Sequence, residues 1–128
     1  MAYLIAVLMA ALSFIVNKAL LTRIGVKTVI TYSPVIEESA KTLLSFYLGA
    51  DIFLTHVVFG VIEAGYDWLT GGRGRSKAAL LSVAGHSLFG GATIVTLRET
   101  GQIGLALTGA IVLHLAWNLL AVKRLRVS

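Results

Sequence analysis

Runs of about 20 mostly apolar residues recur along the whole chain, and they constrain the fold more than any other feature of the sequence. A helix needs about 20 such residues to cross the hydrocarbon core of a bilayer, because it rises about 1.5 Å per residue. Charged residues make up only 13% of the 128 residues, whereas a typical soluble domain is about one-quarter charged. We therefore expect an all-α, polytopic transmembrane helix bundle, formed as a single domain over residues 1–128.

The apolar pattern predicts five spans joined by short connections. They are expected at residues 3–21, within 28–48, and at 51–69, 77–97 and 102–122. In the second span, Ser33 followed by Pro34 is typical of a helix start, with Ser33 as the cap and Pro34 as the first helical residue. No basic segment precedes the first span, so a cleavable signal peptide is not expected.

Basic residues are concentrated on one side of the predicted bundle. Nine Lys or Arg residues lie at the first and third junctions and in the C-terminal tail, whereas only Arg98 lies on the other side. The nine are Lys18, Arg23, Lys27, Arg73, Arg75, Lys77, Lys123, Arg124 and Arg126. The positive-inside rule then predicts the N-terminus outside and the C-terminus in the cytoplasm. We expect an integral protein of a prokaryotic cell membrane, with the bilayer and not a nucleic acid as partner for the net charge of +5.

Several ionisable side chains within the predicted spans lie at one common depth. They are Glu37, Glu38, Glu63, His86 and His114, with Asn118 one turn beyond His114. Counted from the cytoplasmic end of each span, they lie roughly 10–14 Å deep at about 1.5 Å per residue. Charges at such a depth are expensive and usually mark a site, a pathway or an ion pair. A shared level across four helices predicts one convergent site. His56 lies roughly 21 Å deep, and we expect it to be structural or near the outer interface.

These residue types suit hydrolysis by activated water in two ways. In the first, two imidazoles and a carboxylate form the ligand set of a catalytic zinc site, and the three candidate ligands are Glu63, His86 and His114. Glu37 or Glu38 would then act as general base. In the second, no cofactor is needed, because a buried glutamate activates the water with help from the histidines. Asn118 shares a helix face with His114 and is placed to donate a hydrogen bond to an oxyanion. Both chemistries, and both glutamates as base, stay open.

Four short motifs follow one another along the chain. They are Glu37-Glu38-Ser39-Ala40-Lys41, Phe59-Gly60-Val61-Ile62-Glu63, Gly85-His86 and His114-Leu115-Ala116-Trp117-Asn118, each on its own predicted span. This ordered set, within a motif-bearing core of about 31–122, resembles the E-E-x-x-K, F-x-x-x-E, histidine and H-x-x-x-N motifs of PrsW-type intramembrane proteases. These belong to the superfamily of CAAX-processing and bacteriocin-processing (CPBP) membrane proteases. The CAAX branch usually has E-E-x-x-x-R and F-x-x-x-H, so Lys41 and Glu63 favour the PrsW side.

The resemblance implies hydrolysis of a peptide bond within or at the membrane. It assigns Glu37 and Glu38 to catalysis, and it assigns contacts with water, metal or oxyanion to His86, His114 and Asn118. The leading hypothesis is therefore an intramembrane endopeptidase that acts on a membrane protein or peptide. Small residues at Gly85, Gly90 and Gly91 would leave room for an unwound substrate segment.

Two alternatives to a protease stay open. A proton- or cation-coupled carrier would use the same carboxylates and histidines as a relay. Such carriers usually contain repeats, and five spans are few for a carrier. This alternative therefore predicts that the chain forms a homo-oligomer. A non-catalytic scaffold subunit would keep the site without using it.

Overall fold

The computed structural model describes residues 1–25 and 28–126, with side chains at all of these except residues 14, 28, 29 and 122–126. In chain order the elements are α1 (Ala2–Ile24), η1 (Thr28–Tyr32), α2 (Ser33–Tyr47), α3 (Ile52–Thr70), α4 (Arg75–Thr100) and α5 (Ile103–Arg126). The described residues contain no strand, so the all-α prediction is confirmed. Four helices, α1, α3, α4 and α5, are long and apolar enough to cross a membrane, which is compatible with an integral membrane protein.

The second predicted span is shorter than expected. α2 has 15 residues, which give about 22 Å at 1.5 Å per residue and fall short of the roughly 30 Å hydrocarbon core. A single π-helical turn, η1, precedes it. Pro34 lies in the first turn as predicted. The predicted capping role of Ser33 is wrong, because Ser33 is itself helical and its hydroxyl donates to Oδ1 of Asn17 at 2.7 Å.

α2 turns its polar face toward the other helices. Its buried residues are Ser33, Pro34, Glu37, Glu38, Lys41, Thr42 and Ser45. The apolar side chains of Val35, Leu44 and Phe46 are exposed. This is the reverse of an amphipathic helix on a soluble protein, and it suits apolar surroundings, where charges must face the bundle interior. The reversed polarity places the Glu37-Glu38 pair inside the bundle.

Individual residues set the ends of the long helices. Asp51 caps α3, and its side chain accepts a hydrogen bond from the backbone N–H of Leu54 at 2.8 Å. Gly101 ends α4 with φ of 68°, a left-handed conformation that glycine adopts without strain. The short connections that result make α4 an antiparallel neighbour of both α3 and α5.

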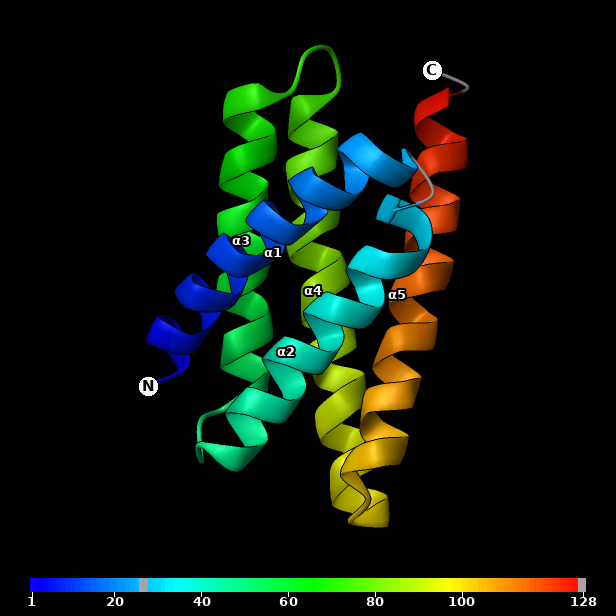
Figure 1. Ribbon diagram of the computed structural model, residues 1–128. Helices are drawn as coiled ribbons and strands as arrows, with labels where there is room; N and C mark the ends of the chain where they lie inside the picture. Colours follow the sequence, from blue (N-terminus) through cyan, green and yellow to red (C-terminus); the bar gives the residue numbers. More distant parts are fainter. Residues whose placement is uncertain (26–27, 127–128) are drawn as a thin grey trace.

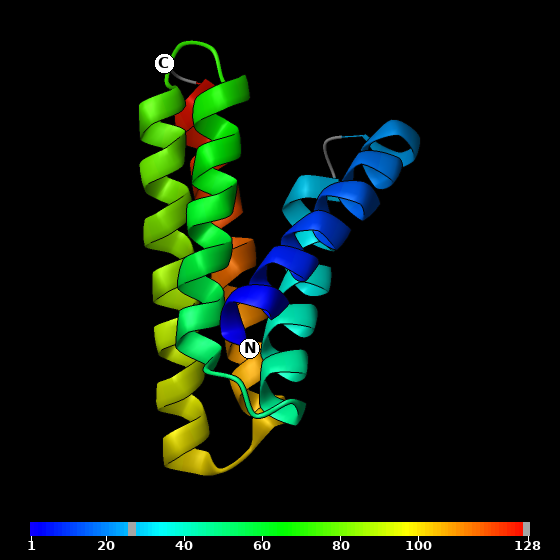
Figure 2. The same cartoon turned by 90° about the vertical axis from the view of Figure 1, so that its left-hand side faces the viewer.

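The helices form an upright group and a tilted pair. α3, α4 and α5 run alongside one another, whereas α1 and α2 cross them obliquely (Figure 1). The C-terminal part of α1 leans away from the three upright helices (Figure 2). The α3–α4 connection and the end of α5 lie at one end, and the other two connections of the upright helices lie at the opposite end. These two ends are the two sides between which the Lys and Arg residues were counted above. Of the residues counted, Lys27 and the side chains of residues 123–126 lie outside the described part of the chain.

Two glycine–histidine contacts set the close packing of α3 on α4. A Cβ atom at Gly60 would lie 2.9 Å from Cβ of His86, and one at Gly90 would lie 2.7 Å from Cβ of His56. Each helix therefore offers a glycine to a histidine of the other, and both imidazoles are buried. The expectation that Gly90 leaves room for a substrate is wrong, because His56 occupies that space.

Candidate active site

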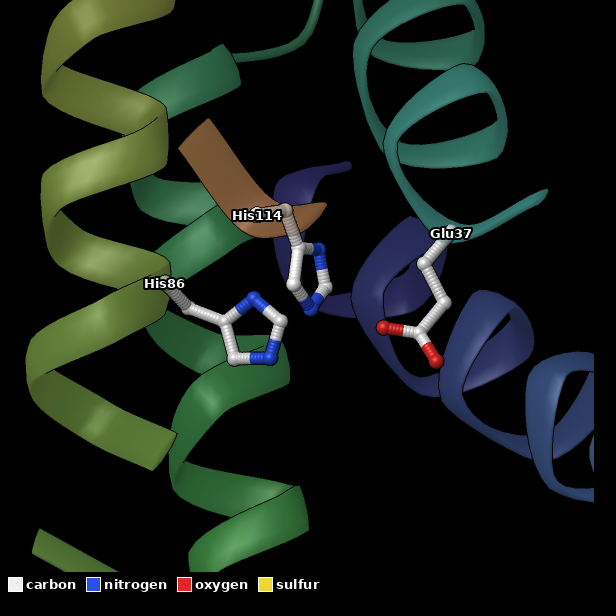
Figure 3. A group of neighbouring side chains, drawn as sticks. All are labelled: Glu37, His86 and His114. Atoms are coloured by element: carbon white, nitrogen blue, oxygen red, sulfur yellow. The ribbon is translucent and has the colours of Figure 1, made fainter. Parts of the chain in front are cut away.

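Side chains from four helices meet in the interior of the bundle. Glu37 projects from α2, His86 from α4 and His114 from α5, and each is at most 5% exposed. One possible ligand atom from each of these three residues lies within 4.8 Å of the other two. Their side chains point toward a common space, with the His114 ring between the other two (Figure 3). Glu63 of α3 joins this group through His86.

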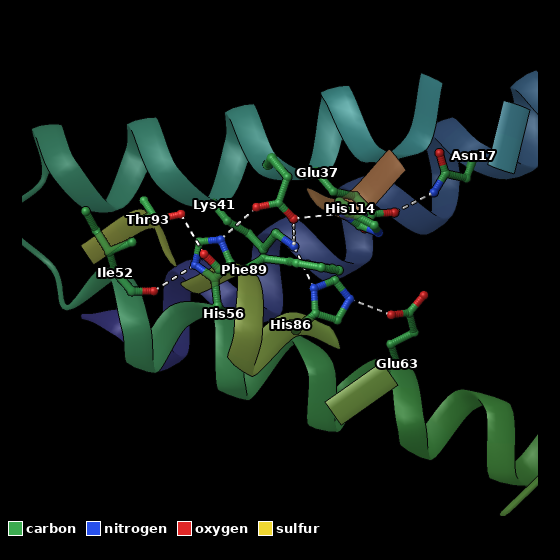
Figure 4. A network of polar contacts seen from close by, with 11 residues as sticks. Asn17, Glu37, Lys41, Ile52, His56, Glu63, His86, Phe89, Thr93 and His114 are labelled. Carbon is green, nitrogen blue, oxygen red and sulfur yellow. Dashed lines mark hydrogen bonds and ion pairs between the residues drawn. The ribbon is translucent and has the colours of Figure 1, made fainter. Parts of the chain in front are cut away.

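Glu38 is the centre of a second set of contacts, which shares His114 with the first group. Its Oε1 atom accepts hydrogen bonds from Nζ of Lys41 at 2.7 Å and from Nδ1 of His114 at 2.9 Å. Its Oε2 atom lies 2.8 Å from Nε2 of His56, whose Nδ1 faces the carbonyl oxygen of Ile52 at 2.9 Å. Figure 4 labels the partners Lys41, Ile52, His56 and His114 of this network. Both carboxylate oxygens of Glu38 are therefore engaged by other side chains, and Glu38 itself is fully buried.

Glu37 lies one residue earlier and has different surroundings. Its Oε1 atom accepts a hydrogen bond from Nδ2 of Asn17 on α1 at 3.0 Å. Ser33 fixes the orientation of that amide, because its hydroxyl donates to Oδ1 of Asn17. Glu37 also lines a cavity of about 610 Å³. Of the two glutamates, Glu37 is therefore the one that borders open space.

The hydrogen bonds of His86 fix its tautomer. Nζ of Lys41 lies 2.9 Å from Nδ1 of His86, and an ammonium group can only donate. Nδ1 therefore accepts, and the ring hydrogen is on Nε2. Nε2 in turn donates to Oε2 of Glu63 at 2.6 Å. Both ring nitrogens of His86 are engaged.

The residues predicted as zinc ligands fit a metal ion only in part. His114 fits, since Nδ1 donates to Glu38 and leaves the Nε2 lone pair for a ligand, an arrangement common around zinc. His86 does not fit, because one nitrogen accepts from Lys41 and the other carries a hydrogen directed at Glu63. In this arrangement, Glu63, His86 and His114 do not provide three ligands for one zinc ion.

Two cavities meet at the site. The larger, of about 610 Å³, lies among α1, α2, α3 and α5, and its walls include Asn17 and Lys18 of α1. The smaller, of about 190 Å³, lies among α3, α4 and α5, and its walls include His86, Asp67 and Ser82. Three residues line both cavities: Glu63, His114 and Asn118. The site can therefore be approached from two directions.

Sequence reasoning did not place His56 or Asn17 among the site residues, although both contact them. His56 was expected at a different depth, but it contacts Glu38 because α2 crosses the upright helices obliquely and the depth count assumes straight spans. Asn17 was missed altogether. Its signal in the sequence was an amide within an otherwise apolar run, which in a membrane usually bonds to another helix.

Comparisons with protein-family models, with curated proteins and with solved structures give no match for this chain.

Proposed function

We propose that the chain is an intramembrane peptidase in which Glu37 activates the hydrolytic water. The observation that carries the proposal is the contrast between the two adjacent glutamates. Glu38 is bound by three side chains, whereas Glu37 borders the larger cavity together with His114 and Asn118. In this proposal Glu37 is the base that faces the substrate, and Glu38 orients His114 from behind.

The proposed reaction uses residues of this chain alone. Glu37 takes a proton from a water molecule that also donates a hydrogen bond to Nε2 of His114. The hydroxide adds to the carbonyl carbon of the peptide bond, and Asn118 donates to the oxygen that becomes negative. Glu37 then returns the proton to the peptide nitrogen, the C–N bond breaks, and a carboxylic acid and an amine are released. Glu38 keeps His114 in the tautomer that this reaction requires.

The substrate in this proposal is a segment of a membrane protein or peptide. The cavity of about 610 Å³ has room for several residues of unwound chain, and unwinding is needed because a helical carbonyl is already hydrogen-bonded. The ordered motifs, which resemble those of PrsW-type proteases, support the same reaction class. We include membership of that superfamily in the proposal.

The first experiment compares three purified full-length proteins on a mixed library of transmembrane peptides. Glu37→Gln removes the base, and Glu99→Gln makes the same change at an exposed residue near the end of α4. We expect wild type and Glu99→Gln to cleave, and Glu37→Gln to lose at least about 100-fold in rate. Full cleavage by Glu37→Gln would contradict the proposal. Proton flux into liposomes that disappears in Glu63→Gln would favour a carrier instead.

We also propose the topology that the charge distribution predicts, with the C-terminus in the cytoplasm of a prokaryotic cell. The chain contains no cysteine, so single cysteines report on topology without background. In intact cells, a membrane-impermeant thiol reagent should label Gln102→Cys in the α4–α5 connection and not Gly72→Cys in the α3–α4 connection. The reverse labelling would invert the topology.

A further inference from the structure

The two cavities that meet at the site differ in size and in wall chemistry. The larger one borders the proposed base, Glu37, and has a volume of about 610 Å³, which exceeds that of a few peptide residues. The smaller one, of about 190 Å³, is too small for such a segment but has room for several water molecules. Its walls carry polar groups at successive positions, including the hydroxyl of Ser82, which donates to Oδ2 of Asp67 at 2.9 Å.

We propose that the smaller cavity, between α3, α4 and α5, is a separate route by which water reaches the site while a peptide occupies the larger one. This inference rests on the proposed function, since it concerns the water that the peptidase would consume. A peptide segment next to Glu37 displaces water from the larger cavity, and lipid around the bundle supplies none. Hydrolysis at a buried site therefore needs a second opening.

The positions of the polar residues define the course of this route. It begins near the α3–α4 connection, where Ala78, Asp67 and Ser82 line the smaller cavity. Asp67 and Ser82 offer water the hydrogen-bond partners that it needs to enter an otherwise apolar interior. The route ends at the three residues that line both cavities: Glu63, His114 and Asn118. Water that passes them arrives beside Glu37.

Thiol reactivity tests the route without any need for a substrate. Ser82→Cys would place a thiol on the cavity wall, whereas Leu80→Cys and Ala84→Cys would place one on the exposed outer surface of the same helix. The two controls lie on either side of Ser82 in depth. In lipid nanodiscs, with the small cationic reagent aminoethyl methanethiosulfonate, only a hydrated thiol ionises and reacts quickly.

We expect Ser82→Cys to react at least about tenfold faster than either control. Depth alone would instead give a steady fall in rate from Leu80→Cys through Ser82→Cys to Ala84→Cys, and that result would overturn the proposal. Ala78→Phe, one helical turn from Ser82, should fill the cavity and slow the reaction of Ser82→Cys. An unchanged rate in that double variant would also overturn it.

The cleavage assay adds a kinetic readout. Ala78→Phe should lower kcat about tenfold and leave KM unchanged, because the water supply and not the peptide site is blocked. A higher KM with unchanged kcat would assign the smaller cavity to the substrate and overturn the proposal. The two hypotheses fail separately. A reactive Ser82→Cys in a chain without cleavage would refute the peptidase alone, and an unreactive one in a cleaving chain would refute the water route alone.

Discussion

Nζ of Lys41 lies 2.9 Å from Nδ1 of His86, although the two residues are 45 positions apart in the chain. The contact joins α2 to α4 and links two carboxylates. On one side Lys41 bonds to Glu38 at 2.7 Å, and on the other His86 bonds to Glu63 at 2.6 Å. A fully buried ammonium is thereby paired with a carboxylate, as charges at this depth require. His86 could bind a metal ion only if this contact were broken.

Cleavage should therefore not depend on a bound metal. We expect the purified protein to contain far less than one zinc per chain by mass spectrometry, and its activity to survive strong chelators. The physical reason is that no lone pair of His86 is available while Lys41 donates to it. One zinc per chain together with chelator-sensitive cleavage would mean that the metal replaces the Lys41–His86 contact.

Loss of the Lys41 ammonium should destabilise the protein strongly. We expect Lys41→Met to lower the free energy of unfolding by about 3–5 kcal/mol, because it leaves Glu38 buried without its cation. Lys18→Met makes the same change at an exposed residue and should have little effect. Denaturant unfolding in detergent measures both. Glu38→Gln should restore part of the loss in the Lys41→Met background, and an unrescued double variant would refute this explanation.

The contact of His56 with Gly90 should not tolerate an added methyl group. Gly90→Ala places a Cβ atom 2.7 Å from Cβ of His56, and we expect it to destabilise the protein by about 1–3 kcal/mol through displacement of α4 from α3. Gly91→Ala is the matched control, since its Cβ atom would have its nearest neighbour at 4.0 Å, on Phe53. Equal unfolding midpoints for the two variants would show that α3 and α4 can separate at no cost.

Asn17 should affect the rate of cleavage more than substrate binding. Its amide holds Oε1 of Glu37 at 3.0 Å, so Asn17→Leu should lower kcat about 10- to 100-fold by misplacing the base, with KM unchanged. Ser33→Ala removes only the hydroxyl that orients the amide and should produce a smaller fall in kcat. A rise in KM with kcat intact would instead place Asn17 in the peptide site.

The sequence predicted the class of fold because runs of about 20 apolar residues occur mainly in membrane-spanning helices. It predicted a convergence of Glu37, His86 and His114 from depth alone, since polar residues in several spans at one level have a physical reason to meet. It could not choose between Glu37 and Glu38, because adjacent helical residues point about 100° apart and the choice depends on where the neighbouring helices lie. His56 was misplaced for a related reason, as the tilt of α2 is set by packing and not by its own residues.

The reversed polarity of α2 has a consequence for biogenesis. Ribosomes deliver α1 and α2 to the membrane before α3, α4 and α5 exist. Until those helices have been made, no protein interior is available to bury the charged face of α2. Placing that face in hydrocarbon instead would cost free energy. The early membrane intermediate must therefore keep α2 at the water interface or in the translocation machinery. The charged face can stabilise the fold only after α3, α4 and α5 have been synthesised.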